Sequence, residues 1–154
     1  ADAIGLVYVR GPQVAGEYAE AGSQLDAEGW FCTRDRGRLD REGYLFLDGR
    51  ADDVIVRGGE NISPGEIEEV LLAHPAVAEA AVVGIPSEQW GEAVGAAVAL
   101  RPGCQCSEAE LQGRVRETLR SSRVPERIRF VAQLPYNETG KLLRREIRDQ
   151  FAAS

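Results

Sequence analysis

The segment VIVRGGENISPGEIEEVLLAH, residues 54–74, shows what kind of fold this chain adopts. A short apolar run is followed by Ser63-Pro64-Gly65-Glu66, which places a capping serine before a proline at the first helical position and a glutamate at the third. Apolar residues then recur at helical spacing until His74-Pro75. The segment therefore predicts a short strand leading into a helix.

The rest of the carboxyl-terminal part continues the alternation of strands and helices. Residues 77–85 and 92–100 are apolar runs typical of strands, and residues 127–131 form another. A second capping pattern begins at Ser107, and a last helix follows residue 141 with its apolar side chains on one stripe. This order predicts an α+β domain in which helices pack on a short mixed sheet.

The amino-terminal part contains only strand and loop patterns. Residues 4–10, 30–33 and 44–47 are expected to be strands, with a loop before Gly29, and the polar segment 48–53 suits a domain boundary. About fifty residues of this kind are too few to fold independently. We therefore expect residues 1–50 to be the β-rich end of a larger missing domain and residues 51–154 to be a small domain.

Composition and charge exclude some classes of function. The 154 residues are 44% apolar and 28% charged, and the net charge of −7 argues against broad binding to nucleic acid or anionic membranes. No apolar run is long enough to span a membrane and no signal peptide is evident, so a cytoplasmic protein with reduced thiols is expected. The Cys104-x-Cys106 pair has no second ligand pair, so no metal site is predicted.

The basic residues are concentrated near the carboxyl end. From Arg123 onward there are seven basic and four acidic residues, which suits either a phosphate-bearing ligand or a solvated helix face. Lys141 lies in a Thr-Gly-Lys loop before the last helix, where a cation opposes the helix dipole, and is either functional or an exposed loop lysine. Asp35 follows a predicted strand and could accept ribose hydroxyls, or could be a solvated turn residue.

Four motifs together resemble one known family. GWFCTRD (residues 29–35) resembles GWFxTGD, DGRADDVI (residues 48–55) resembles GRxDDxI, RGGENISPGEIE (residues 57–68) resembles RGGENISPxEIE, and PYNETGKLLRR (residues 135–145) resembles PxxxTGKxxRR. These are segments of the ANL superfamily of adenylating enzymes, and their order and spacing cover essentially the whole chain. The chain thus looks like the carboxyl-terminal part of an acyl-CoA synthetase.

The resemblance implies a reaction in two steps and a role for several residues. A carboxylic acid would first attack the α-phosphate of ATP, giving acyl-AMP and pyrophosphate, with Lys141 bridging the carboxylate and the phosphate oxygens. Asp35 would hold the ribose hydroxyls and Arg50 would lie near the nucleotide. ATP and Mg²⁺ would be bound mainly by the missing large domain, so the fragment alone is expected to be inactive.

The second step would use coenzyme A. Asp52 would be the hinge about which the small domain rotates. Gly58 and Gly59 would then line the pantetheine channel, since neither has a Cβ atom to block it, although a simple turn remains an alternative. Acetylation of Lys141 by a lysine acetyltransferase would remove its charge and stop the first step.

One residue departs from the family pattern, and two other functions stay open. Arg34 stands where the family has glycine, which permits close approach or unusual backbone angles, so the tightness of the ribose site is in question. An adenylation domain that loads a carrier protein is the alternative within the superfamily. A non-catalytic interaction module is the alternative outside it.

Overall fold

The computed structural model describes residues 3–14, 17–18, 22–23 and 25–152, and the chain divides into two compact units, residues 1–52 and 53–154. The two units are described separately below. Within the described residues, no helix has the length and apolar character needed to cross a membrane.

The first unit contains a three-stranded antiparallel sheet in the order β1-β4-β5. Its strands are β1 (Gly5–Val9), β4 (Phe31–Leu39) and β5 (Leu45–Arg50). The strands predicted over residues 30–33 and 44–47 extend further along the chain than expected. Their additional residues include charged ones, which show no apolar alternation but still pair with the neighbouring strand. The loop predicted before Gly29 also contains a small pair of strands, β2 (Glu17–Tyr18) and β3 (Gly22–Ser23).

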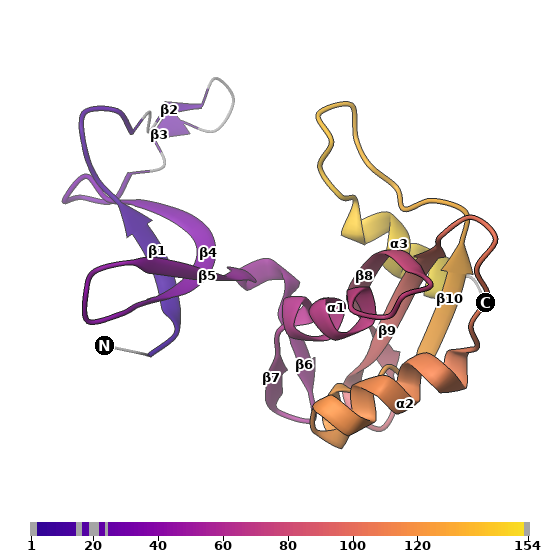
Figure 1. Ribbon diagram of the computed structural model, residues 1–154. Helices are drawn as coiled ribbons and strands as arrows, with labels where there is room; N and C mark the ends of the chain where they lie inside the picture. Colours follow the sequence, from indigo (N-terminus) through magenta and orange to yellow (C-terminus); the bar gives the residue numbers. More distant parts are fainter. Residues whose placement is uncertain (1–2, 15–16, 19–21, 24, 153–154) are drawn as a thin grey trace. The chain divides into compact units, whose positions relative to one another are not determined.

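The second unit is an α+β fold, which confirms the predicted class (Figure 1). A short 3-10 turn, η1 (Ala51–Asp53), comes first. The elements that follow it are β6 (Ile55–Arg57), β7 (Glu60–Ile62), α1 (Pro64–Leu72), β8 (Val77–Ser87), β9 (Gly91–Leu100), α2 (Glu108–Thr118), a second 3-10 turn η2 (Ser121–Arg123), β10 (Arg127–Val131) and α3 (Arg144–Ala152).

Strand β9 is the centre of a mixed five-stranded sheet. It pairs along its length with β8 in the antiparallel sense and over Gly95–Ala99 with β10 in the parallel sense. The β6–β7 hairpin joins β9 through the single pair Arg57–Gly91, and the Glu92 carboxylate extends this contact by accepting a hydrogen bond from the Val56 amide (Oε2–N 2.7 Å).

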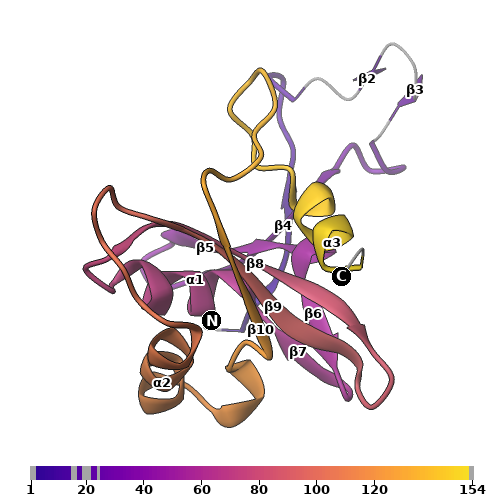
Figure 2. The ribbon, with the colours of Figure 1, turned by 90° about the vertical axis from the view of Figure 1, so that its right-hand side faces the viewer.

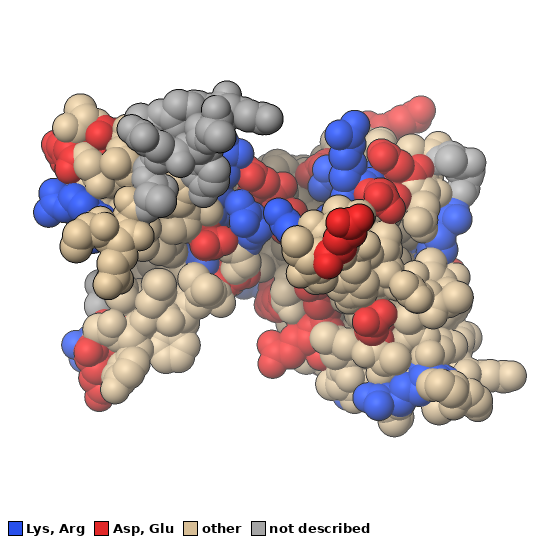
Figure 3. All heavy atoms as spheres, turned by 90° about the horizontal axis from the view of Figure 1, so that it is seen from above, with Lys and Arg blue, Asp and Glu red and all other residues tan. Residues whose placement is uncertain are grey.

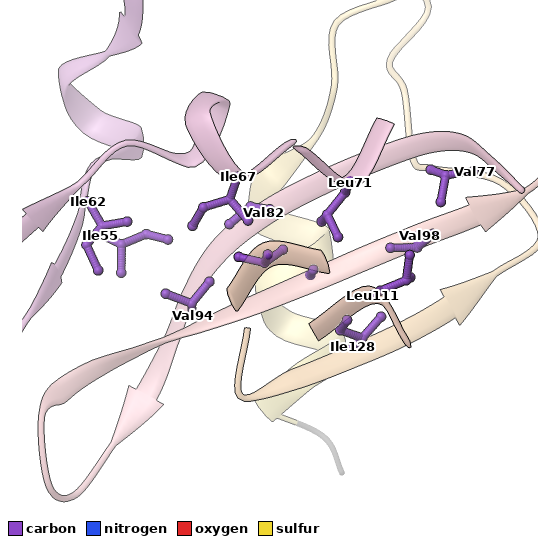
Figure 4. Close-up of a cluster of buried hydrophobic side chains, with 12 residues drawn as sticks. Ile55, Ile62, Ile67, Leu71, Val77, Val82, Val94, Val98, Leu111 and Ile128 are labelled. Atoms are coloured by element: carbon purple, nitrogen blue, oxygen red, sulfur yellow. The ribbon is translucent and has the colours of Figure 1, made fainter. Parts of the chain in front are cut away.

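Helices cover both faces of this sheet (Figure 2). Helices α1 and α2 contribute to one apolar cluster with β6 to β10, shown in Figure 4. Helix α3 packs on the opposite face, where Ile147 and Phe151 meet apolar side chains of β8 and β9. Every buried apolar residue among those described, from Ile55 to Phe151, belongs to the second unit.

The two predicted helix caps differ in the structure. Ser107 caps α2 as predicted, since its hydroxyl accepts a hydrogen bond from the Glu110 amide (3.2 Å). Ser63 precedes α1 in an extended conformation but makes no side-chain cap bond, and the Glu66 carboxylate binds the Arg123 guanidinium instead (2.8 Å). The predicted helix is present, therefore, without the predicted capping box.

Charged side chains of both signs are interspersed on the face seen in Figure 3. Several charged side chains of the second unit form ion pairs, among them Arg57 with Glu126 and Arg123 with Glu60. The hydrogen bond from Arg123 lowers the pKa of the Glu60 carboxyl below its usual value. Among the basic residues from Arg123 onward, Arg123 and Arg144 are paired with acidic partners.

Candidate functional site

Lys141 lies in a hairpin-like loop between β10 and α3. The Leu143 amide donates to the Pro135 carbonyl (2.9 Å), and the Asn137 amide donates to the Lys141 carbonyl (3.0 Å). Tyr136 and Leu142 form an isolated antiparallel bridge at the base of this loop. We call residues 135–143 the lysine loop.

Asn137 organises the tip of the lysine loop. Its Oδ1 atom accepts hydrogen bonds from the Thr139 amide (3.1 Å), the Thr139 hydroxyl (2.8 Å) and the Lys141 amide (2.7 Å). Gly140 adopts a φ of 79°, and its amide donates to the Asn137 carbonyl (2.9 Å). The backbone of Lys141 is therefore held in place while its side chain remains exposed.

Both arms of the loop are attached to the sheet. In the first arm Leu134 is buried, and the Tyr136 hydroxyl donates to Glu79 Oε1 on β8 (3.2 Å). Burial and the adjacent Glu79 carboxylate raise the pKa of Tyr136 above its usual value. The second arm continues into α3, which begins at Arg144. Lys141 therefore lies before the first turn of the helix, where the unfavourable interaction of its charge with the helix dipole is weaker than predicted.

Lys141 is also the only lysine in the chain. The other 17 of the 18 basic residues are arginines. A lysine ammonium is a compact charge with three rotatable donors, which arginine does not reproduce. The single exception to an otherwise uniform use of arginine is a compositional signal that points to Lys141 independently of any motif.

Asp35 and Arg50, the predicted nucleotide-binding residues, lie side by side in the first unit. They are cross-strand neighbours on β4 and β5, and Arg50 Nη1 lies 3.9 Å from Asp35 Oδ1. Both side chains are partly exposed, at 34% for Asp35 and 42% for Arg50. The Asp35 carboxylate is therefore accessible to a polar ligand beside a fixed positive charge.

The backbone next to Asp35 is unusual. Arg34 has a φ of 59°, the left-handed region that favours glycine, and it is the only non-glycine residue of the described chain with positive φ. The Thr33 hydroxyl donates to the Val7 carbonyl and accepts from the Asp35 amide, both at 3.1 Å, so it fixes the chain on either side of Arg34. The Arg34 guanidinium lies 3.3 Å from the carboxylate of Asp52, the predicted hinge residue.

Gly58 and Gly59 form the two-residue turn of the β6–β7 hairpin. Their φ angles are 56° and 85°, and Arg57 pairs with Glu60 across the turn. The Gly58 amide donates to the Trp90 carbonyl (2.9 Å), and a Cβ atom on Gly58 would lie 2.9 Å from the Trp90 ring. The turn foreseen as an alternative is present, and residue 58 has no room for a side chain.

Trp90 is a contributor to this turn that sequence reasoning missed. Its indole ring contacts Gly58. The Arg57 guanidinium lies over the same ring, 4.6 Å from the ring centroid, in a cation–π contact. The signal was available, because Trp90 precedes Gly91 in the only connection between two long apolar strands.

The structure brings Asp35 and Arg50 together in the first unit and places Lys141 and Gly58-Gly59 in two separate turns of the second. The boundary between the units falls directly after Asp52. Among the described residues no group of three or more His, Cys, Asp or Glu side chains could hold a metal ion.

The second unit is thus a small α+β fold whose lysine loop holds an exposed lysine. Residues 66–141 match the family described as the AMP-binding enzyme C-terminal domain. Residues 66–141 belong to this family, and the motifs place the chain in the ANL superfamily of adenylating enzymes.

Three relatives illustrate the similarity. The chain is 46% identical over 147 residues to the 2-succinylbenzoate–CoA ligase of Geobacillus kaustophilus, covering 94% of this chain and 30% of that protein. It is 43% identical over 152 residues to the fatty acid–[acyl-carrier-protein] ligase ScoC of Streptomyces coeruleorubidus, covering 97% of this chain and 29% of that protein. The amide bond synthetase McbA of Marinactinospora thermotolerans superposes with a TM-score of 0.89 at 37% identity, covering 97% of this chain and 32% of that structure.

The chain thus spans about 30% of the length of the relatives it matches. By name, these relatives are a CoA ligase, an acyl-carrier-protein ligase and an amide bond synthetase. Similarity at this level therefore identifies the family but does not choose the acceptor.

Proposed function

We propose that this chain is part of an AMP-forming ligase that activates a carboxylic acid with ATP and transfers the acyl group to coenzyme A. Residues 1–50 would be the end of its large domain and residues 51–154 its small mobile domain. The observation that carries the proposal is Lys141, the single lysine of the chain, exposed at the tip of a loop whose backbone Asn137 fixes.

The chemistry of the first step suits this arrangement. When a carboxylate attacks the α-phosphate, negative charge builds up on the phosphate oxygens, and a preorganised ammonium stabilises it at little reorganisation cost. Because the lysine loop is attached to β8 and α3, Lys141 would move with the whole second unit. Mg²⁺ and most contacts to ATP would be supplied by the part of the enzyme that lies outside this chain.

The first unit supplies two further parts of the proposal. Asp35 would accept the ribose hydroxyls and Arg50 beside it would face the nucleotide, both from the β4–β5 pair. The same sheet exposes large apolar side chains, including Leu6, Phe46 and Leu47, which the remainder of the large domain would cover. Asp52 would be the hinge, since the compact units divide directly after it.

The Gly58-Gly59 turn would serve the second step. Its backbone has no side chain on either residue, so a pantetheine arm could pass close to it. The open space lies at Gly59, where nothing stands within 4 Å of a Cβ position, whereas the Trp90 ring fills that space at Gly58.

The test is Lys141→Ala in the full-length enzyme, with each half-reaction measured separately. Formation of acyl-AMP should fall by about 10²–10³-fold, the range expected for removing one charge-stabilising donor. Transfer of the acyl group from supplied acyl-AMP to coenzyme A should change little, because Lys141 has no role in that step.

Glu138→Gln is the matched control, since Glu138 is an exposed charged residue on the same loop. It should leave both half-reactions close to wild type. If Lys141→Ala retains full adenylation, Lys141 is an ordinary loop lysine and the proposed mechanism is wrong.

A carrier-protein thiol is the second candidate acceptor, because a relative 43% identical to this chain is an acyl-carrier-protein ligase by name. The full-length enzyme should be offered coenzyme A and a phosphopantetheinylated carrier protein under the same conditions. Faster transfer to coenzyme A supports the proposal, and faster transfer to the carrier replaces it.

The exposure of Lys141 also makes it a proposed target of a lysine acetyltransferase. Acetylation removes the positive charge, so it should stop the first half-reaction and spare the second. An enzyme acetylated at Lys141 that still forms acyl-AMP at the wild-type rate would rule this out.

A further inference from the structure

Arg144 is the first residue of α3, directly after the lysine loop, and its side chain is largely buried. All three of its guanidinium nitrogens have partners. Nη1 and Nη2 donate to the two carboxylate oxygens of Glu68 (2.5 and 3.1 Å), Nη1 also donates to the Val82 carbonyl (2.8 Å), and Nε lies 3.2 Å from Asp53 Oδ2. We call these four residues the arginine hub.

The arginine hub connects four parts of the second unit. Glu68 belongs to α1, Val82 to β8, and Asp53 is the first residue after the division between the two units. Glu68 is itself fixed, since its Oε1 atom accepts a hydrogen bond from the Val82 amide (2.7 Å). Only 15% of the Glu68 side chain is exposed, so little solvent competes for these contacts.

Arg144 remains charged within the hub. Burial lowers the pKa of the Arg144 guanidinium, but the hydrogen bond to Glu68 and the charges of Glu68 and Asp53 more than offset it, and the pKa lies above its usual value. A buried ion cluster of this kind adds little stability compared with apolar residues of the same volume, because desolvation cancels most of the attraction. What it does provide is a defined geometry, since a planar fork accepts only a narrow range of partner positions.

The lysine loop depends on this geometry. Leu143, which precedes Arg144, closes the base of the loop through its bond to Pro135 and also accepts from the Ile147 amide in the first turn of α3 (3.4 Å). A shift of Arg144 would therefore move Leu143 and the second arm of the loop. The first arm is attached separately, through Tyr136 and Glu79.

We propose that Arg144 is a positioning residue for Lys141: through Glu68, Val82 and Asp53 it fixes the second arm of the lysine loop relative to the residue that follows the hinge. This inference rests on the proposed function, because it assigns to Arg144 the placement of the adenylation lysine. Arg144 itself touches no reacting atom. Its effect is confined to the half-reaction that uses Lys141.

The test uses Arg144→Lys in the full-length enzyme, with Arg145→Lys as the matched control, because Arg145 is adjacent and exposed. A lysine at 144 keeps the charge and the fold but cannot reach both Glu68 oxygens, the Val82 carbonyl and Asp53 together. The kcat of acyl-AMP formation should fall about 10- to 100-fold, the cost typical of a small misplacement of a catalytic group. The KM for ATP and the transfer from supplied acyl-AMP should stay within about threefold, and Arg145→Lys should match wild type in all three.

Hydrogen exchange provides a readout that does not depend on the role of Lys141. In Arg144→Lys the amides of residues 137–143 should exchange faster, while those of β8 and β9 remain as in wild type. Glu68→Gln, which weakens the same contact from the other side, should reproduce both effects in part. Arg145→Lys should not change the exchange pattern.

The possible outcomes separate the two proposals. If Arg144→Lys leaves loop exchange and adenylation unchanged, or lowers both half-reactions equally, Arg144 is not a positioning residue. If loop exchange rises in Arg144→Lys but Lys141→Ala still adenylates, the hub positions the loop and the proposed function of Lys141 is the part that fails.

Discussion

Arg34 holds a backbone conformation that costs a side-chain-bearing residue about 1 kcal/mol or more. We expect Arg34→Gly to be more stable than Arg34→Ala by about 1 kcal/mol, because only glycine adopts a φ near 59° without strain. Both variants lose the exposed ion pair with Asp52, so that contact cancels in the comparison. The measurement is native-state hydrogen exchange of the β4 amides in the full-length enzyme.

The same pair of substitutions at Arg36 provides the control. Arg36 lies in the same strand without a positive φ, so Gly should there be less stable than Ala by about 0.5–1 kcal/mol. Finding the same sign at both positions would show that the conformation of Arg34 is not strained.

For single residues, the sequence indicated which positions are unusual better than it indicated their backbone angles and contacts. The motif around Asp35 singled out Arg34 as a departure from glycine, and the structure shows that the backbone there has the angle glycine favours. The pairing of Arg34 with Asp52 was not predicted, because residues 18 positions apart meet only once β4 and β5 pair. The arginine hub was missed for the same reason, since its partners are separated by up to 76 positions in the sequence.

The β6–β7 hairpin is the element whose turn the structure constrains most. Gly58→Ala should be more destabilising than Gly59→Ala, although both need a positive φ. A Cβ atom at residue 58 would lie 2.9 Å from the Trp90 ring, whereas nothing lies within 4 Å of one at residue 59. We expect about 1 kcal/mol of lost stability at residue 59 from backbone strain and an additional 1–3 kcal/mol at residue 58 from overpacking.

Urea unfolding of the 154-residue chain, followed by circular dichroism, measures this difference. A third variant, Gly58→Ala with Trp90→Leu, removes the ring that the new methyl group would meet. If the additional loss at residue 58 persists in that variant, the contact with Trp90 is not its cause.

A helix or strand could be predicted where the residues that determine it lie close together in the sequence. Helix α2 was found because Ser107 and Glu110 make the cap within a single turn. Strand β7 was missed because it has only three residues, Glu60 to Ile62, and two of them are polar. Its existence depends on the two-residue turn Gly58-Gly59, which was expected either to line a channel or to form a simple turn, but not to connect two strands of a hairpin.

At the scale of the whole molecule, the two units differ in how their apolar residues are distributed. All the buried apolar residues of the described chain lie in the second unit. In the first unit, large apolar residues of the three-stranded sheet are 36% to 65% exposed, namely Leu6, Tyr8, Val9, Leu39, Leu45, Phe46 and Leu47. A three-stranded sheet without a covering layer buries too little surface to offset the entropy of folding.

The fold class and the family could be predicted at this scale, because helix caps, strand runs and four motifs agree. How the proposed site residues would meet could not be predicted, because Asp35 and Lys141 belong to units that fold around different sets of contacts. A catalytic arrangement that forms only when one unit moves against another has no local signal in the sequence.

Residues 53–154 should therefore fold without residues 1–52. Their core includes two apolar clusters on opposite faces of one sheet, and both are built from this unit alone. We expect cooperative thermal unfolding of the isolated segment 53–154, with a heat-capacity change of about 1.2–1.5 kcal/mol/K, the value typical of a domain of roughly 100 residues. Residues 1–52 alone should show no such transition, because their apolar side chains lack a second layer. Calorimetry of the two segments, each compared with the 154-residue chain, measures this. If segment 53–154 unfolds without cooperativity, its core needs the first unit in order to fold. The division of the chain into a second unit that folds alone and a first unit that does not would then be wrong.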